Sequence, residues 1–511
     1  MEIIKPLTSL DELLSFSTEY VAPEMIARNL CDTLEKTPKN QPKLLVCHDM
    51  AGNYHEDKFC GGCPSEDPYY LTAWPYIDIF VYFSHNLVTI PTVGWTNCAH
   101  LHNVSVLGTF ITEFDEGAKI SERLLENRTI IDQACEKLSD IALKYNFDGW
   151  LLNIENVIQF DHVPNLAYFV QKLTELCKMK LGNERSQVIW YDSVTINGDL
   201  KWQNELNELN EMFFLLCDGI FLNYTWKDEN LHKSCDFVAR INQHHVGKSQ
   251  IFVGVDAFGR GCLGGGGFEC RLAFREINKF ALSMALFAPA WPYEHLGAED
   301  FAANNFEFWK LIAQFKTCRK YLKLPISTTF NIGKFIGCKN DDDDNKHCMI
   351  FNLSDQNQQP HFFCGGKSSD EIKSIIHEFD HKFPTGQALT FELESQRPVC
   401  CRLFCCQIPI KSIFTIRLEF MTENSSLTNE FSIELSIKLG YFFHGDKRNV
   451  ISYKIGTENS KKSEEISARE EWQIEVNPST LSDEEVILEF IDFGACSSSK
   501  AKIYLFKFIL S

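Results

Sequence analysis

Long apolar runs and basic residues are both scarce in this 511-residue sequence. No stretch of about 18 uncharged apolar residues occurs, and a membrane-spanning helix needs about that many. Lys and Arg together number 49 against 69 Asp and Glu, which gives a net charge of −20. An acidic surface repels phosphate backbones and anionic lipids. We therefore expect no membrane span, and neither nucleic acid nor a membrane as a partner.

The 20 cysteines are too few and too scattered for a disulfide scaffold. Several lie inside apolar runs, as Cys47 and Cys177 do, which is typical of buried thiols in a reducing compartment. The N-terminal residues contain no apolar stretch of secretory length. Cys60 and Cys63 have zinc-like spacing, but no second pair follows at the distance of a zinc module. We expect a cytosolic protein without a metal site.

Residues 40–290 alternate short apolar runs with segments of helical period. Such runs are typical of parallel strands that helices cover on both faces. Eight of them over about 250 residues predict a (β/α)8 barrel, with a doubly wound open sheet as the alternative. No G-x-G-x-x-G follows a strand, which is against a dinucleotide-binding sheet. The runs are Leu44–Met50, Ile77–Ser84, Val104–Thr112, Gly149–Glu155, Val188–Val194, Gly219–Tyr224, Gln250–Gly259 and Met284–Ala290.

The pattern changes after residue 320. Phe414–Phe420 and Phe431–Leu439 alternate apolar and polar residues, which predicts half-buried antiparallel strands. Val486–Phe493 and Ile503–Ile509 are similar, whereas the charged run Lys339–Lys346 is expected to be a solvated loop. We therefore predict a catalytic barrel over residues 1–320 and a sandwich-like β region over residues 321–511.

The run Gly149–Glu155 carries polar residues only at its carboxyl end. Because side chains alternate along a strand, Leu151, Asn153 and Glu155 share one face, and the apolar Trp150, Leu152 and Ile154 share the other. The polar face points into the barrel at the end where barrel active sites lie. A carboxylate there is costly unless it is used or paired. Asn153 and Glu155 are therefore candidate catalytic residues, and the alternative is that they satisfy each other or a loop.

These residues also carry a resemblance. Asp148-Gly149 followed by Asn153-x-Glu155 resembles the D-G-x-D-x-D-x-E strand of chitinase-type glycosidases, with Leu151 and Asn153 in place of two Asp residues. The N-x-E form is similar to that of glycoside hydrolase family 85, the endo-β-N-acetylglucosaminidases. Further blocks of that family are matched in order by Cys47–Tyr54, Ile77–Trp95, Leu107–Gly117, Trp190–Val194 and Trp202–Leu206.

The resemblance implies cleavage of the β-1,4 bond between the two core GlcNAc residues of N-glycans, free oligosaccharides and glycoproteins. Because a neutral Asn is a poor nucleophile, the substrate's own 2-acetamido oxygen would attack the anomeric carbon and form an oxazoline or oxazolinium. Glu155 would be the acid and then the base, and Asn153 would orient the acetamide and favour its neutral tautomer. Tyr191 would steady either group. Retention of configuration, some transglycosylation and no cofactor are expected.

Aromatic residues near strand ends are candidates for a sugar platform, because pyranose rings stack on aromatic faces. Trp202 and Trp226 are favoured since they follow strand ends within polar segments, and core packing is the alternative for each Trp. Polar residues near strand ends could bind substrate or line the barrel. The aromatic candidates are Trp95, Trp202, Trp226, Trp291, Tyr293 and Phe83, and the polar candidates are His48, Asn223 and Asp256.

Two other functions compete with an endoglycosidase. A chitinase-like hydrolase of the same clan is disfavoured by Leu151 and Asn153. A glycan-binding protein without catalysis is disfavoured by the intact Asn153 and Glu155, since binding alone needs no proton donor. The sequence leaves open the oligomeric state, the role of the β region, and the choice between high-mannose and complex glycans.

Overall fold

A computed structural model describes most of the chain. The charged run 339–346 lies outside the described residues, so its prediction as a loop stays a prediction. The described residues are 2–17, 19–52, 54–241, 246–338, 347–363, 375–379, 387–394, 396–424, 431–441, 451–456, 469–477, 486–497 and 501–511.

Eight parallel strands form a closed barrel. Strand β3 pairs with both β1 and β5, so the ring closes and the open-sheet alternative is wrong. Each predicted apolar run supplies one strand, which confirms the barrel. The strands, in ring order, are β1 (Leu44–His48), β3 (Ile79–Tyr82), β5 (Ser105–Glu113), β6 (Gly149–Glu155), β7 (Gln187–Tyr191), β8 (Gly219–Leu222), β9 (Ile251–Asp256) and β10 (Ser283–Phe287).

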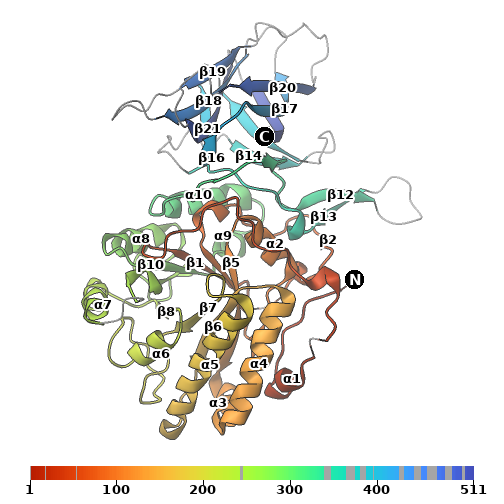
Figure 1. Cartoon of the computed structure of the whole chain (residues 1–511). Helices are drawn as coiled ribbons and strands as arrows, with labels where there is room; N and C mark the ends of the chain where they lie inside the picture. The colour runs from red at the N-terminus through yellow and green to blue at the C-terminus, as the bar shows by residue number, and fades with distance from the viewer. Residues whose placement is uncertain are drawn as a thin grey trace.

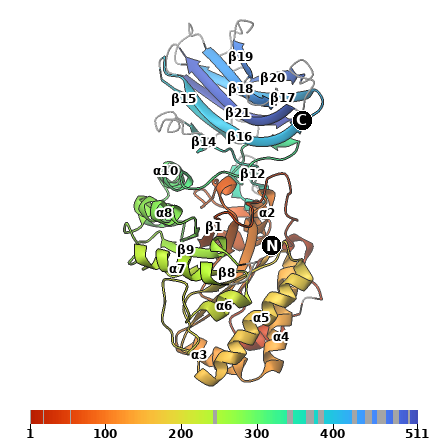
Figure 2. The same ribbon diagram turned by 60° about the vertical axis from the view of Figure 1, so that its left-hand side comes forward.

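Helices surround the barrel (Figures 1 and 2). Helix α4 begins where the Asn127 side chain accepts a hydrogen bond from the Ile130 N–H and ends at the left-handed Asn146. No helix among the described residues is long and apolar enough to cross a membrane. The helices are α1 (Leu10–Ser15), α2 (Val93–Leu101), α3 (Phe114–Leu125), α4 (Arg128–Tyr145), α5 (Val163–Leu181), α6 (Glu211–Leu216), α7 (Asp228–Arg240), α8 (Cys270–Lys279), α9 (Trp291–Leu296) and α10 (Phe301–Ala313).

The predicted alternation along β6 is confirmed by the two apolar cores that it separates. Trp150, Leu152 and Ile154 belong to the large core between the strands and the helices. Leu151 instead belongs to a smaller core inside the barrel, with Leu107 of the neighbouring strand β5. Because side chains alternate, Asn153 and Glu155 point inward with Leu151.

The C-terminal strands form two antiparallel sheets that share one apolar core, as a sandwich does. The predicted alternating segments are strands of these sheets, whereas the domain boundary near residue 320 stays a prediction. One sheet contains β11 (Ile326–Thr328), β14 (Ile375–Phe379), β15 (Gln387–Leu393), β17 (Phe414–Asn424), β20 (Arg469–Val476) and β22 (Ala501–Leu510). The other contains β16 (Val399–Ile410), β18 (Phe431–Tyr441), β19 (Ile451–Gly456) and β21 (Val486–Ser497).

A small third sheet lies where the two parts meet. Strands β12 (Lys334–Cys338) and β13 (His347–Phe351) form a hairpin, and β13 also pairs with β2 (Cys63–Pro64) from the N-terminal part. The short β4 (Val88–Thr89) pairs antiparallel with β5 outside the ring. In Figure 1, α10 and this hairpin lie between the barrel and the blue C-terminal strands.

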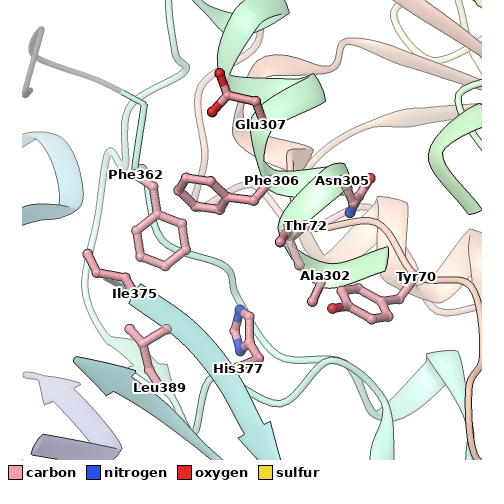
Figure 3. Close-up of a pocket in the computed structure, with 11 residues that line it drawn as sticks. Tyr70, Thr72, Ala302, Asn305, Phe306, Glu307, Phe362, Ile375, His377 and Leu389 are labelled. Atoms are coloured by element: carbon pink, nitrogen blue, oxygen red, sulfur yellow. The ribbon is translucent and has the colours of Figure 1, made fainter. Parts of the chain in front are cut away.

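A cavity of about 460 Å³ also lies at this junction (Figure 3). Its walls come from α10 and from strands β14 and β15, and include Phe306, Phe362 and His377. Its carboxylate, Glu307, is ion-paired with Lys310 at 2.8 Å. The described residues that line this cavity therefore supply no unpaired acid of the kind that glycosidic chemistry needs.

Asp148 fixes the amino-terminal end of β6, opposite the carboxyl-terminal end that carries Glu155. Its buried carboxylate accepts hydrogen bonds from His100 Nε2 at 2.9 Å, from Val106 N at 2.7 Å and from Arg185 Nε. Burial raises the pKa of Asp148, but His100 and Arg185 outweigh it and hold the pKa below its usual value. The next residue has φ +142°, and a Cβ at Gly149 would lie 1.8 Å from the Gln187 carbonyl oxygen, so only glycine fits.

We expect Asp148→Ala to lower the free energy of unfolding by about 3–5 kcal/mol, because it leaves the partners of a buried charge unpaired. Urea unfolding followed by circular dichroism measures this. The exposed Asp115 is the matched control, and its change to Ala should cost less than about 1 kcal/mol. Equal, small effects of both substitutions would contradict the anchoring role of Asp148.

Candidate active site

Strand β6 brings Asn153 and Glu155 to the mouth of the barrel. Asn153 lies opposite Ile111 of β5, and Glu155 lies opposite Glu113. Pairing with β7 ends earlier, at Leu152. The carboxyl end of β6 therefore projects beyond its β7 neighbour, so its side chains border a cavity rather than a packed layer.

Asn153 holds Glu155 with one end of its amide and leaves the other end free. Asn153 Nδ2 donates to Glu155 Oε2 over 3.2 Å. Asn153 Oδ1 is buried in a residue that is only 5% exposed, and it has no hydrogen-bond partner among the described residues. Buried polar atoms without partners are rare because each costs about 1–3 kcal/mol. This oxygen is therefore poised to accept a hydrogen bond from a ligand.

The environment of Glu155 favours its protonated form. Burial raises the pKa of this carboxyl, and the neighbouring Glu113 raises it further. Hydrogen bonds from Asn153 and from the Trp202 indole act in the opposite direction because they stabilise the carboxylate. The net shift is upward, so Glu155 keeps its proton to a higher pH than an exposed glutamate, as a general acid must.

A second ionisable pair lies beside Glu155. His85 Nδ1 is 2.8 Å from Glu113 Oε1, and this hydrogen bond raises the pKa of His85. The nearby carboxyls of Asp49 and Glu155 raise the pKa of His85 further. Three carboxyls and one histidine therefore share this end of the barrel.

The cavity above β6 has a volume of about 180 Å³. Its floor is the barrel interior, and its walls are largely aromatic, which is typical of a site that binds sugar rings. It is lined by Cys47, Phe83, His85, Leu151, Asn153, Glu155, Tyr191, Phe221, Tyr224, Arg260 and Phe287.

Tyr191 faces the cavity from the end of β7. Burial raises its pKa well above the usual value, and the nearby Glu155 adds to this, so its hydroxyl stays protonated. That hydroxyl lies 3.0 Å from Asn223 Oδ1 and donates to it. Asn223 therefore orients Tyr191, whereas the sequence alone offered substrate binding or barrel lining for Asn223.

Two of the aromatic candidates reach the site. Phe83 lines the cavity and packs edge-on against His85, with ring centroids 5.3 Å apart. Trp202 is 41% exposed and its indole contacts Glu155. A ring that is open to solvent beside the acid is suited to stack on a sugar.

The structure does not bring the other aromatic candidates to this cavity. Trp95 and Trp226 are only 2% and 3% exposed. Their indoles donate to Asp57 Oδ2 at 3.0 Å and to the Gly254 carbonyl at 2.7 Å. Both therefore pack in the core, the alternative that the sequence left open. Trp291 packs on Phe268 and His295, and the Tyr293 hydroxyl donates to the Asp67 carbonyl.

His48 and Asp256 also have structural surroundings. The His48 ring is buried and stacks on Tyr69, and burial lowers its pKa to about 3, so it is neutral. Asp256 is buried and accepts hydrogen bonds from Arg260 Nε at 2.7 Å and from the Phe258 N–H at 3.0 Å. Asp256 therefore acts on the cavity indirectly, because it holds the Arg260 side chain that lines it.

Sequence reasoning missed Glu113, which neighbours Glu155, and several residues that line the cavity. Glu113 could have been found from the alternation rule, since it ends β5 in step with the inward Ile111. His85 and Arg260 lie in loops beyond strand ends, where no periodicity predicts the direction of a side chain. Tyr224 ends the apolar run Gly219–Tyr224 and Phe287 lies within the run Met284–Ala290, and an apolar run predicts a strand but not which of its residues face a cavity.

Known proteins resemble this chain in sequence. A sequence model described as Glycosyl hydrolase family 85 matches residues 53–337. The cytosolic endo-beta-N-acetylglucosaminidase of Gallus gallus is 38% identical over 413 residues, which cover 77% of this chain and 55% of that protein. The Homo sapiens protein of the same name is 40% identical over 329 residues, 64% of this chain and 43% of that protein. The chain thus spans about half the length of the curated relatives it matches.

A solved structure agrees in fold. The glycoside hydrolase domain of Endo-D from Streptococcus pneumoniae R6 matches with a TM-score of 0.72 at 17% identity, and the match covers all of this chain and 83% of that one. At this identity the likeness shows the fold alone. The family model, in contrast, matches more than half of the chain and includes the strand with Asn153 and Glu155. The chain belongs to glycosyl hydrolase family 85.

Proposed function

We propose that this protein is an endoglycosidase that cleaves the β-1,4 bond between the two core GlcNAc residues of N-glycans, on free oligosaccharides or glycoproteins. Membership of the family and the names of the curated relatives support this activity. The observation that carries the mechanism lies in the Asn153 amide: its Nδ2 donates to Glu155 Oε2 over 3.2 Å, whereas its buried Oδ1 has no hydrogen-bond partner among the described residues.

The first step uses the substrate's own acetamide as the nucleophile. Asn153 Oδ1 accepts the acetamide N–H and turns the acetamide oxygen toward the anomeric carbon. As that oxygen bonds to the carbon, the glycosidic bond breaks and Glu155 gives its proton to the leaving oxygen. An intramolecular attack of this kind gains a large proximity advantage. The product is an oxazolinium ion that keeps the acetamide proton on its nitrogen, and this N–H stays hydrogen-bonded to Asn153 Oδ1.

The second step reverses the role of Glu155. Its carboxylate, now ionised, takes a proton from water as the water oxygen attacks the anomeric carbon. The bond between that carbon and the acetamide oxygen breaks, which opens the oxazolinium ring and restores the neutral acetamide. Two inversions at one carbon give net retention of configuration. A sugar hydroxyl can replace the water, so transglycosylation accompanies hydrolysis. Tyr191, fixed by Asn223, places a neutral hydroxyl beside the reacting groups.

We also propose that the protein works in the cytosol. The curated relatives carry this location in their names. The cysteines whose surroundings are described are free thiols, and most are buried, which suits a reducing compartment.

Mass spectrometry of the products from a defined N-glycan tests the cleavage site. We expect one GlcNAc on each product, and we expect Glu155→Gln to lower kcat about 10²–10⁴-fold because the proton donor is lost. The exposed Glu208→Gln is the matched control and should keep the parent rate. Cleavage at any other bond, or a Glu155→Gln enzyme as fast as the parent, contradicts the proposal. Faster cleavage of chitin oligomers than of the N-glycan would favour the chitinase-like alternative.

Asn153→Ala separates formation of the oxazoline from its use. We expect a loss of at least about 100-fold in kcat/KM on the glycoside, because the acetamide is no longer oriented. A preformed sugar oxazoline with an acceptor should still react within about tenfold of the parent rate, since it bypasses that step. The buried Asn156, which hydrogen-bonds only loop and helix groups, is the control, and its change to Ala should affect both donors alike. Equal losses on both donors for Asn153→Ala would remove its assigned role.

Trp202→Phe tests the electrostatics of the acid. This change keeps an aromatic ring but removes the indole donor to Glu155, so the carboxylate is less stabilised and its pKa rises. Because activity is lost as the pH rises through the pKa of the acid, the alkaline limb of the kcat/KM profile should move up by about half a pH unit. Trp226→Phe, which removes a buried donor far from the acid's oxygens, should leave the limb in place. A downward shift in Trp202→Phe would refute the contact.

A further inference from the structure

The loop after β7 carries Trp202 to Glu155 and is held by a buried carboxylate. Asp192 Oδ2 accepts from the backbone N–H of Gln203 at 3.0 Å and of Asn204 at 2.8 Å. Asp192 Oδ1 accepts from Asn210 Nδ2 at 3.0 Å. One side chain at the end of β7 therefore fixes the two residues that follow Trp202.

The carboxylate of Asp192 weakens the fold at neutral pH. Burial raises its pKa to about 6, although Asn210 and the backbone donors oppose this rise. When the pKa of a carboxyl is higher in the folded than in the unfolded protein, the free energy of unfolding falls as the pH rises between the two pKa values. For Asp192 this range runs from its ordinary pKa to about 6. The three hydrogen bonds that the Asp192 carboxyl accepts nevertheless fix the loop that carries Trp202 to Glu155.

Asn204 connects this loop to the neighbouring strand end. Its backbone has φ +58°, in the left-handed region that Asn tolerates better than most residues. Its Oδ1 accepts from the Thr225 N–H at 3.0 Å, from the Thr225 hydroxyl at 2.8 Å and from Asn223 Nδ2 at 3.0 Å. Thr225 and Asn223 follow β8, so the Asn204 amide ties two loops together.

The network ends at a residue of the cavity. The same Asn223 that donates to Asn204 accepts the Tyr191 hydroxyl. Tyr191 and Asp192 are adjacent at the end of β7, so the chain of hydrogen bonds leaves that strand through Asp192 and returns to it through Tyr191. Trp202 and Tyr191, which both neighbour Glu155, therefore share one support.

We propose that Asp192 and Asn204 are positioning residues for the reaction, and that Asn204 couples the place of Trp202 to the orientation of Tyr191 beside Glu155. Neither residue touches substrate in this assignment. The inference rests on the proposed endoglycosidase function, and it goes beyond that function because it places determinants of activity in a loop support outside the cavity. Loosening the support displaces the indole donor and the tyrosine hydroxyl together.

Substitutions at Asn204 can separate the contribution of its side-chain acceptor from that of its left-handed backbone conformation. Asn204→Gly keeps the left-handed conformation free of strain and removes the acceptor. Asn204→Asp keeps an acceptor oxygen and also tolerates positive φ. Gln203→Ala is the matched control, because the Gln203 side chain contacts only Lys201 and Asn207 of its own loop. Thermal unfolding of each variant establishes that it is folded.

A double-mutant cycle on the N-glycan gives the kinetic readout. We expect Asn204→Gly to lower kcat/KM about tenfold in the parent, but less than about threefold in a Trp202→Ala background. With no indole left to place, only the part of the loss that comes from Tyr191 remains there. Asn204→Asp and Gln203→Ala should stay within about threefold of the parent. If Asn204→Gly lowers kcat/KM equally in both backgrounds, or not at all in the parent, the proposed coupling between Asn204 and Trp202 is wrong.

Hydrogen exchange provides a readout that needs no activity. The amides of residues 201–210 should exchange faster in Asn204→Gly than in the parent or in Gln203→Ala. Unchanged exchange in Asn204→Gly overturns the positioning role whatever the kinetics. A parent protein that cleaves no N-glycan, with exchange that responds as expected, refutes the proposed function and leaves the loop support standing.

Discussion

The outward packing of Trp150, Leu152 and Ile154 against the helices is the constraint on which the site depends. Side chains alternate along β6, so these three apolar anchors oblige Leu151, Asn153 and Glu155 to point inward. A shift by one residue would bury the acid among the helices, at a cost that no partner there offsets. Asp148 fixes the other end of the same strand through His100, Val106 and Arg185. Packing and polar anchoring therefore set the direction of the two reactive groups before any substrate arrives.

Around this strand, the supporting residues differ from Asn153 in whether their acceptor atoms are hydrogen-bonded within the protein. Asp192, Asn204 and Asn223 have their acceptors filled by donors of the protein. Asn153 Oδ1 has none, in a position where an unfilled acceptor is costly. The supports hold Tyr191 and Trp202, and in the proposed mechanism the unfilled oxygen accepts the acetamide N–H of the substrate. Burial and the neighbouring Glu113 hold the pKa of Glu155 above its usual value.

The sequence predicts the strands and the side chains that point inward from them, but it does not predict where loop residues lie. Buried parallel strands are apolar whatever follows them, so all eight could be located, and alternation placed Asn153 and Glu155 on the inner face. Trp226 was favoured because it follows a strand end, but its loop folds the ring back under the Gly254 carbonyl. Trp95 lies on α2 rather than in a loop, and its buried ring packs on His48. The pairing of β13 with β2 joins residues almost 300 positions apart, and no local pattern signals it.

The direct test of the account is a crystal structure of the Glu155→Gln protein with an intact core disaccharide of an N-glycan. The account predicts the acetamide nitrogen within about 3.2 Å of Asn153 Oδ1, with the acetamide oxygen turned toward the anomeric carbon. An acetamide that points away from Asn153, with Oδ1 still unpartnered, would contradict substrate-assisted catalysis at this site.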